Sequence, residues 1–419
     1  MTTDADAPAA AEKAPRIPFP ELVAITAAVM ALNALAVDMM LPALGRIGDE
    51  LGAAHPNDRQ LVVVAYVLGN GLAQILLGPL VDRFGRRRVL LGSLAGYVAG
   101  SILSIIAPTF SLLLAARGFQ GVATAAARVA SMAIVRDQCS GRQMAKVLSL
   151  AITIFMAAPI LAPSFGQLVL FAAPWRWIFL VLLAYAVTVA VWLFWRLPET
   201  LPKSKHVNLR PGPIIAAYWD FASTRVSSGY ALASACIFGS LFGYISASEQ
   251  IFVETFHLGA RFPIAFAATA SSFAVATLVN ARLVGRFGMR RLAHGALIGF
   301  VFVNLIHLAT AESVGENMFV FIGFMSVSFF AIGLFGPNAN SMAMEPMGHI
   351  AGSAAAAYGF ATTTLAASLG AIVGRLYNGA TTPVIAGFAG LGLAAFLIVV
   401  VTEKGRLFHP GHPEEDPVP

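Results

Sequence analysis

Twelve long apolar segments, separated by short charged or Pro/Gly-rich breaks, constrain this chain more than any other feature. A helix needs about 20 apolar residues to cross the hydrocarbon core of a bilayer. Transmembrane β-strands would appear as short stretches of period two, whereas these runs are long and rich in Ala, Leu and Gly. We therefore predict transmembrane helices at about 20–44, 59–81, 88–107, 111–135, 146–171, 175–196, 228–255, 263–285, 291–311, 316–343, 351–377 and 382–402.

The composition argues against the soluble classes of protein. Apolar residues occupy 58% of the 419 positions and charged residues only 11%, whereas a soluble domain carries about 25% charged residues. A soluble enzyme, a disordered protein and a nucleic-acid binder are therefore not expected. The net charge of +6 does not favour nucleic acid, because the basic residues lie in short loops between apolar segments. Cys139 and Cys236 are too few for a disulfide framework.

Basic residues set the expected orientation, because Lys and Arg accumulate in cytoplasmic loops. With the amino terminus inside, 20 of the 27 Lys and Arg residues fall in cytoplasmic segments, 5 in outer segments and 2 within the fourth span. Both termini are therefore predicted to be cytoplasmic. Residues 1–19 are polar and lack the apolar core of a secretory signal, so we expect a disordered cytoplasmic tail.

The longest break between apolar segments divides the chain into two sets of six spans. Residues 20–196 are expected to form an amino-terminal bundle, 197–227 a cytoplasmic linker, 228–402 a carboxy-terminal bundle and 403–419 a second cytoplasmic tail. The segment IIAAYWDFASTR within the linker is a candidate for a short surface helix.

The two sets of spans also contain a repeat. GPLVDRFGRRRV at Gly78–Val89 aligns with ARLVGRFGMRRL at Ala281–Leu292, and seven of the twelve positions are identical. Parallel repeats of this kind are found in transporters whose substrate site lies near the midplane between the halves.

Two motifs point to one family. Gly78-Pro-Leu-Val-Asp82-Arg83-Phe-Gly85-Arg86-Arg87-Arg88 completes the pattern G-x-L-x-D-R-x-G-R-R, and resembles the loop between spans two and three of the major facilitator superfamily. Val37-Asp38-Met-Met-Leu-Pro42-Ala-Leu is similar to the TDMYLPAL segment of its Bcr/CflA drug-resistance transporters, which usually have Thr or Ser where Val37 stands.

Two further segments resemble motifs of the same family. Arg117-Gly-Phe-Gln120-Gly121 resembles the R-x-x-Q-G motif of proton-coupled members in span four. Ala158-Pro159-Ile-Leu-Ala-Pro163-Ser-Phe-Gly166-Gln167 resembles the antiporter motif of span five, although the family usually has Gly where Gln167 stands. The resemblance runs from about residue 20 to residue 400.

The resemblance implies an all-α integral membrane fold of 12 transmembrane helices in two pseudo-symmetric six-helix bundles. It also implies a proton-coupled antiporter that exports lipophilic drugs or related small molecules by alternating access. Such a protein is expected in the bacterial inner membrane, as a monomer, driven by the proton gradient and without a cofactor. The sequence contains neither a nucleotide-binding G-x-x-x-x-G-K-[ST] motif nor a metal-ligand spacing, so neither a metal nor an enzyme activity is expected.

Three ionisable residues are candidates for proton coupling. At 1.5 Å per residue, Asp38 and Arg117 would both lie about 9 Å below the outer surface, and charged residues inside a membrane usually pair or face a cavity. We therefore expect the Asp38 carboxyl to exchange a proton, with Arg117 changing its proton affinity as the two approach. Glu249, late in span seven, is the second acidic candidate. Alternatively, Asp38 is interfacial, Arg117 reaches lipid headgroups, and Glu249 belongs to the outer surface.

Two other groups of residues are expected to control the conformation. A carboxylate at Asp82 can accept from the amino end of a helix, so Gly78, Asp82, Arg83, Gly85, Arg86 and Arg87 are predicted to form a gating latch on the inner face. The alternative is that these arginines serve topology alone. Pro159, Pro163 and Gly166 are expected to break or kink span five, which either seals the path against leak or has no role in transport.

The substrate cavity is expected to be apolar and aromatic with few fixed polar groups, which tolerates many lipophilic ligands. Arg128 lies eleven residues after Arg117 on nearly the same helix face, where it could offset an anionic group of a substrate or pair with a backbone carbonyl. The candidate lining residues are Tyr66, Gln74, Arg128, Met156, Tyr244, Gln250, Phe273, Asn338 and Tyr358.

Three alternative functions remain open at this point. A substrate-specific exporter, for instance of sugars or amino-acid metabolites, would have the same scaffold. A proton-coupled importer is compatible with the incomplete span-five motif. An integral-membrane enzyme would need a cluster of reactive groups at one depth, for which Asp38, Arg117 and Glu249 are the only candidates.

Overall fold

The computed structural model describes residues 17–201 and 211–409, and all regular structure in these ranges is helical. Eleven stretches are long and apolar enough to cross a membrane, and one of them, Met318–Arg375, contains 58 residues and is bent at Glu345–Ile350. Because this bend divides the stretch into two crossings, the total is twelve crossings, as predicted. They are α1 (Phe19–Asp38), α3 (Leu61–Phe84), α4 (Arg86–Ile106), α5 (Phe110–Gln138), α6 (Gly141–Ala172), α7 (Arg176–Arg196), α9 (Arg225–Glu249), α10 (Phe262–Phe287), α11 (Met289–Val314), α12 (Met318–Met344), α13 with α14 (Ala351–Phe360, Ala366–Arg375) and α15 (Thr382–Thr402).

Shorter elements join the crossings. The linker helix α8 (Pro211–Ser223) occupies the segment expected to form a surface helix. The predicted tails lie outside the described residues at 1–16 and 410–419, as does the linker at 202–210. The remaining short elements are η1 (Leu41–Ala43), α2 (Leu44–Leu51), η2 (Pro56–Gln60), η5 (Gly259–Arg261), η6 (Glu345–Ile350) and the π turns η4 (Gln250–Thr255) and η7 (Ala361–Leu365).

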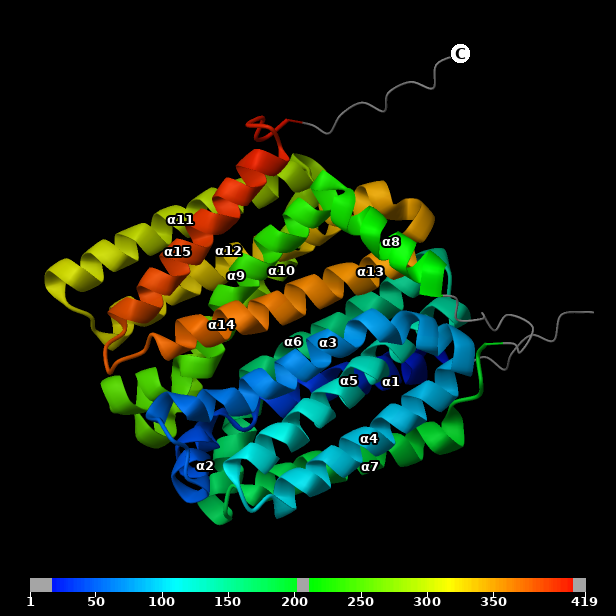
Figure 1. The fold of residues 1–419 in the computed structure, drawn as a ribbon, viewed down its shortest axis with the longest axis horizontal. Helices are drawn as coiled ribbons and strands as arrows, with labels where there is room; N and C mark the ends of the chain where they lie inside the picture. Colours follow the sequence, from blue (N-terminus) through cyan, green and yellow to red (C-terminus); the bar gives the residue numbers. More distant parts are fainter. Residues whose placement is uncertain (1–16, 202–210, 410–419) are drawn as a thin grey trace, which may run out of the picture.

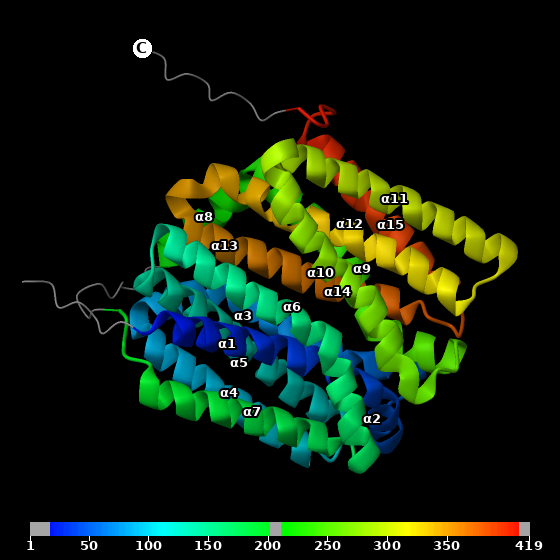
Figure 2. The ribbon, with the colours of Figure 1, turned by 180° about the vertical axis from the view of Figure 1, so that it is seen from behind.

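The crossings form two halves with the same pattern of helix contacts (Figures 1 and 2). In the amino half, α3 packs on α5, α1 on α6, and α4 on both α5 and α7. In the carboxy half, the corresponding pairs are α10 with α12, α9 with α14, and α11 with both α12 and α15. The seam between the halves is formed by α3 against α13 and by α6 against α10. Since these are again equivalent pairs, the pseudo-symmetric arrangement predicted from the repeat is confirmed.

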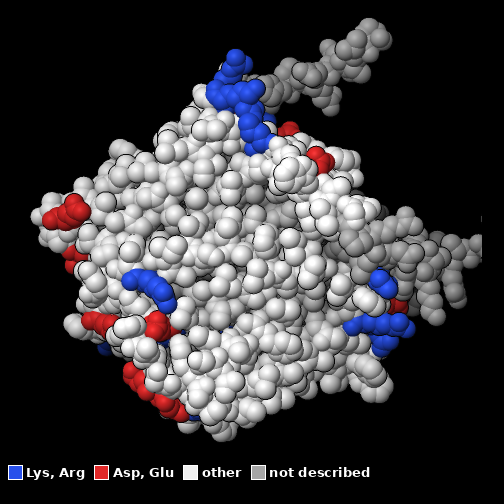
Figure 3. Space-filling model, viewed as in Figure 1, with Lys and Arg blue, Asp and Glu red and all other residues white. Residues whose placement is uncertain are grey.

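Charged residues gather at the two ends of the molecule, and the face seen in Figure 3 is nearly uncharged between them. We call the end that carries Ile17 and His409 the terminal end, and the opposite end the distal end. Exposed Leu, Phe, Val and Trp side chains are abundant on the outer surface, as is required of helices that face lipid. The chain is thus a multi-pass membrane protein.

The first crossing ends earlier than predicted. Its helix was expected to continue to residue 44, but α1 ends at Asp38 and a turn at Met39 and Met40 leads into η1. Pro42 accounts for the difference, because proline has no backbone N–H to donate to the carbonyl four residues earlier, which is that of Asp38. Asp38 is therefore the last residue of its helix and does not lie several residues inside it.

Candidate functional site

A cavity of about 950 Å³ lies between the two halves and extends to the terminal end. Both halves line it, through α3 and α5 on one side and α12, α13 and η7 on the other, and the linker helix α8 borders it as well. Arg136, near the end of α5, and Met144, near the start of α6, place the mouth of the cavity at the terminal end.

Three of the nine residues predicted to line a cavity do line this one: Gln74, Arg128 and Tyr358. The Gln74 amide donates to Asn70 Oδ1 at 3.1 Å and to Thr363 Oγ1 at 3.2 Å, so it links the two halves. The Tyr358 hydroxyl donates to Ser234 Oγ at 3.0 Å. Arg128 is exposed to the cavity and has no hydrogen bond or ion pair from its side chain to any described residue.

The other six predicted lining residues lie elsewhere. Tyr244 is fully buried in an aromatic cluster of the carboxy half, with its ring centroid 4.9 Å from that of Phe329. Asn338 is also buried and donates to Asn280 Oδ1 at 2.6 Å. Which face of a helix meets the cavity depends on how the helices rotate against one another, which hydropathy does not reveal. The remaining four, which likewise do not border the cavity, are Tyr66, Met156, Gln250 and Phe273.

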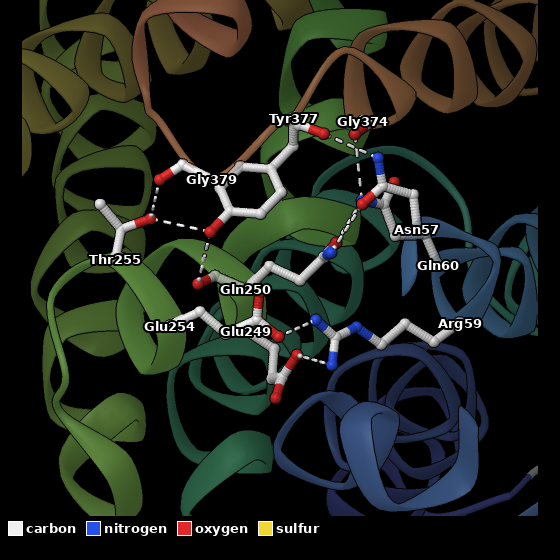
Figure 4. Close-up of polar contacts among 10 residues, drawn as sticks. All are labelled: Asn57, Arg59, Gln60, Glu249, Gln250, Glu254, Thr255, Gly374, Tyr377 and Gly379. Carbon is white, nitrogen blue, oxygen red and sulfur yellow. Dashed lines mark hydrogen bonds and ion pairs between the residues drawn. The ribbon is translucent and has the colours of Figure 1, made fainter. Parts of the chain in front are cut away.

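At the distal end, amide side chains close the seam between the halves (Figure 4). Asn57 of η2 donates to the Tyr377 carbonyl at 2.7 Å and accepts from the Gln250 amide at 2.7 Å. Gln60 donates to Gln250 and, at 3.0 Å, to the Gly374 carbonyl at the end of α14. Residues about 190 and 320 positions apart in sequence thus meet at one place, which we call the distal network.

Ion pairs strengthen this closure. Arg59, on the amino half, lies 3.6 Å from Glu249 Oε2 and also pairs with Glu254, both on the carboxy half. Arg59 and Glu249 are 8% and 5% exposed, so this is a largely buried pair. Arg375 pairs with Asp58 at 3.4 Å across the same seam. The protein is therefore closed at its distal end while its cavity extends to the terminal end.

Asp38 and Arg117 are both buried, but no ion pair joins them in the described structure. Arg117 is completely buried and donates to the carbonyls of Ala36 at 2.8 Å and Val62 at 3.2 Å and to Gln120. Asp38 is 4% exposed, and its Oδ1 has no hydrogen-bond partner within the described ranges. Arg117 thus ties α5 to α1 and α3, and neither side chain reaches the surface or borders the cavity.

The span-five prolines do not break their helix, since α6 runs without interruption from Gly141 to Ala172. The nearby Gly166 has a packing role, because a Cβ atom there would lie 1.8 Å from the Met39 carbonyl oxygen. This close approach places α6 directly against the turn that follows Asp38. Pro159 and Pro163 lie inside this helix.

The basic loop between the second and third crossings is organised by carboxylates from its own half. Gly85 turns the chain between α3 and α4 with φ of 91°, a conformation that favours glycine. Glu199 accepts from the backbone N–H groups of Arg86 at 2.9 Å and Arg87 at 3.4 Å, and so caps α4. Arg86 also pairs with Asp137 at 3.0 Å. Arg83 lies over the Phe84 ring, and the Asp82 side chain and the surroundings of Gly78 lie outside the described part of the structure.

Several of these residues were not predicted. Asn57 and Gln60 belong to the polar run His55–Gln60 between the first two crossings, and such a run is unusual in so apolar a chain. Their partners lie in the other half, so only the run itself carries a signal. Glu199 follows the sixth crossing and gives no indication of the helix that it caps. Within the described ranges, no group of three or more His, Cys, Asp and Glu residues could hold a metal ion.

Comparison with known proteins gives a consistent result. The family model described as Major Facilitator Superfamily matches residues 26–371. The bicyclomycin resistance protein homolog of Haemophilus influenzae is 27% identical over 359 residues, 83% of this chain and 87% of that protein. The multidrug resistance protein MdtL of Escherichia coli is 32% identical over 184 residues, 44% of this chain and 47% of MdtL. The crystal structure of the human organic anion transporter MFSD10 (TETRAN) aligns with 92% of this chain and 100% of its own, at 18% identity and a TM-score of 0.66, a likeness in fold alone.

Proposed function

This chain belongs to the major facilitator superfamily of transporters, and we propose that it exports lipophilic small molecules, drugs among them, in exchange for protons. The observation that carries the proposal is a cavity shared by both halves, open toward the terminal end and closed at the distal end. Alternating access needs such a state, together with a second one in which the other end is open. The resistance functions in the names of two relatives support a drug as substrate.

The distribution of charge is compatible with the proposed direction of transport. The excess of Lys and Arg in the loops of the terminal end supports placing that end in the cytoplasm. A bacterial inner membrane is the setting that fits this orientation and the bacterial relatives. In that setting the cavity opens to the cytoplasm, which is the side from which an exporter takes up its substrate.

Protons would act through Asp38 and Glu249. The Asp38 carboxylate is buried beside the turn on which α6 packs, and one of its oxygens lacks a partner within the described ranges. A proton gained or lost there changes a charge in a region that α1, α5 and α6 share. Glu249 meets Arg59 across the seam, so a proton on Glu249 would remove an attraction that holds the distal end closed.

Transport into inverted membrane vesicles tests the proposal. With a pH gradient imposed, a fluorescent lipophilic drug should accumulate in vesicles that contain the protein, and dissipating the gradient should release it. Asp38→Asn should reduce accumulation to the level of empty vesicles at equal protein content. The control Glu312→Gln removes an exposed carboxylate at the distal end and should transport normally. Accumulation that ignores the gradient would refute proton exchange, and full activity of Asp38→Asn would remove that residue from the mechanism.

A further inference from the structure

Arg128 places a positive charge deep in the cavity. It lies ten residues before Gln138, the last residue of α5, which corresponds to about 15 Å along the helix. Arg128 therefore lies nearly three helical turns inside the terminal end of α5. This depth distinguishes Arg128 from the basic residues of the terminal loops. Those residues are explained by the usual accumulation of Lys and Arg in cytoplasmic loops.

Arg128 also differs from the other arginines held inside the protein. Arg117 is satisfied by two backbone carbonyls and a glutamine, and Arg59 by two carboxylates. The Arg128 side chain has no such partner within the described ranges. Charged groups at this depth are costly and normally pair or serve a function. The group that compensates Arg128 is therefore expected to come from whatever enters the cavity.

The rest of the cavity wall shares this charge. The described lining residues include Arg136 and His349 besides Arg128, and none of them is Asp or Glu. Arg136 is eight residues after Arg128, about 12 Å farther along α5 toward the mouth, and both side chains line the cavity. His349 contacts Asp220 at the mouth, 2.8 Å from its Oδ2. Between these groups the wall is mainly apolar, formed by residues such as Ala125, Val129, Met132, Ala355 and Ala356.

We propose that this cavity selects lipophilic molecules that carry one carboxylate, with Arg128 as the counter-ion of that group. The inference rests on the proposed function, because it assumes that the cavity is the transport site. A guanidinium binds a carboxylate through two parallel hydrogen bonds, and the apolar wall accommodates the rest of the ligand. Tyr358 and Gln74 line the same space and offer further hydrogen-bonding groups. Lipophilic cations are disfavoured, because they would meet two arginines and no described carboxylate.

Three probes with one carbon skeleton test the proposal: phenylbutyrate, its methyl ester and phenylbutylamine, which are negative, neutral and positive at neutral pH. Binding to the purified full-length protein in nanodiscs would be measured by calorimetry. Phenylbutyrate should bind about tenfold more tightly than the ester, which is the effect expected of one charge-assisted hydrogen-bonded pair. Phenylbutylamine should bind most weakly.

Substitutions then assign the preference to a residue. Arg128→Gln should weaken phenylbutyrate binding about tenfold and leave the ester unchanged, so retained ester binding also reports an intact cavity. Arg128→Lys keeps the charge without the planar fork and should retain part of the preference. The matched control Arg291→Gln removes an exposed positive charge at the terminal end that does not line the cavity, and it should leave phenylbutyrate binding unchanged because that charge is screened by water.

The inference is overturned if the ester binds wild-type protein as tightly as the acid does, or if Arg128→Gln keeps the preference for the acid. If Arg128→Gln does not fold, the comparison of acid and ester binding in the wild-type protein and in Arg128→Lys still tests the inference. Gradient-driven export of a neutral drug in vesicles is measured separately. If the wild-type protein does not export the neutral drug, the proposed function is refuted. If it exports the drug normally but does not bind the acid more tightly than the ester, only the role of Arg128 is refuted.

Discussion

At the distal end, amide and charged side chains close the seam between the two halves, whereas beyond the Gln74–Thr363 contact a cavity separates the halves as far as the terminal end. Asn57, Gln60 and Gln250 find partners across the seam, while Arg128 finds none among the described residues. Both regions lie on the same seam, where α3 faces the crossing formed by α13 and α14. The difference indicates that, at one end, the halves are held together by polar contacts that water can replace. At the other end they form a cavity that a ligand can occupy.

Polar closure suits a contact that must open in every cycle. A hydrogen bond between neutral groups contributes a net of about 0.5–1.5 kcal/mol, because water replaces the partner when the contact opens. A seam closed by interlocking apolar side chains would expose them to water on opening, at a cost of about 25 cal/mol per Å². The distal network therefore holds the closed state by an amount that differential binding of a substrate can offset.

The largest effect is expected from Gly374→Val, which displaces the central glutamine of the distal network. A Cβ atom at Gly374 would lie 2.1 Å from Gln60 Oε1, so the Gln60 amide would have to move away and lose its hydrogen bonds to Gln250 and to the Gly374 carbonyl. Export should fall to background, and a cysteine at the buried position Ser248 should become accessible to an impermeant maleimide added outside. Cys139 and Cys236 would first be replaced by serine, since both are free thiols.

Gly390→Val is the matched control for that substitution. A Cβ atom at Gly390 in α15 meets nothing within 4 Å, so transport and labelling should remain normal. Equal labelling of the two variants would show that distal closure does not depend on the contact between Gly374 and Gln60.

A smaller effect is expected from Arg59→Gln. The substitution leaves Glu249 buried without its cation, and breaking a largely buried pair costs about 3–5 kcal/mol. Labelling at Ser248→Cys should therefore rise at least about tenfold while some export remains. Arg46→Gln removes an exposed arginine of the same end and should have no effect. Equal labelling of both variants would mean that the ion pair does not hold the distal end closed.

The smallest effect is expected from Glu199→Gln, because this contact lies within one half. A carboxylate at a helix amino terminus contributes about 0.3–1 kcal/mol, so thermal unfolding should occur at a slightly lower temperature. Labelling at Ser248→Cys should not change, which would separate contacts that stabilise a half from contacts that close the seam. A clear rise in labelling would instead assign the α4 cap to the conformational balance.

The twelve crossings could be predicted because length and hydropathy are properties of each segment by itself. The end of α1 also had a local signal, Pro42, although the apolar run continues beyond it. The pairing within the distal network had no such signal beyond the polar run itself, because Asn57 and Tyr377 are 320 residues apart and become neighbours only after both halves have folded. For Tyr244, what could not be foreseen was the rotation of α9, which directs the ring into its own half.

The π turn at Ala361–Leu365 joins the two arms of one crossing, α13 and α14. A π turn contains one residue more than an α-helical turn. If it tightened to α-helical geometry, one arm would turn by about 100° and move about 1.5 Å relative to the other. Tyr358 borders the cavity on the first arm, and Gly374 meets Gln60 on the second. This crossing therefore has one extra backbone residue between α13 and α14. Its removal from the turn would couple a change near Tyr358, at the cavity, to a rotation and shift of Gly374 at the distal end.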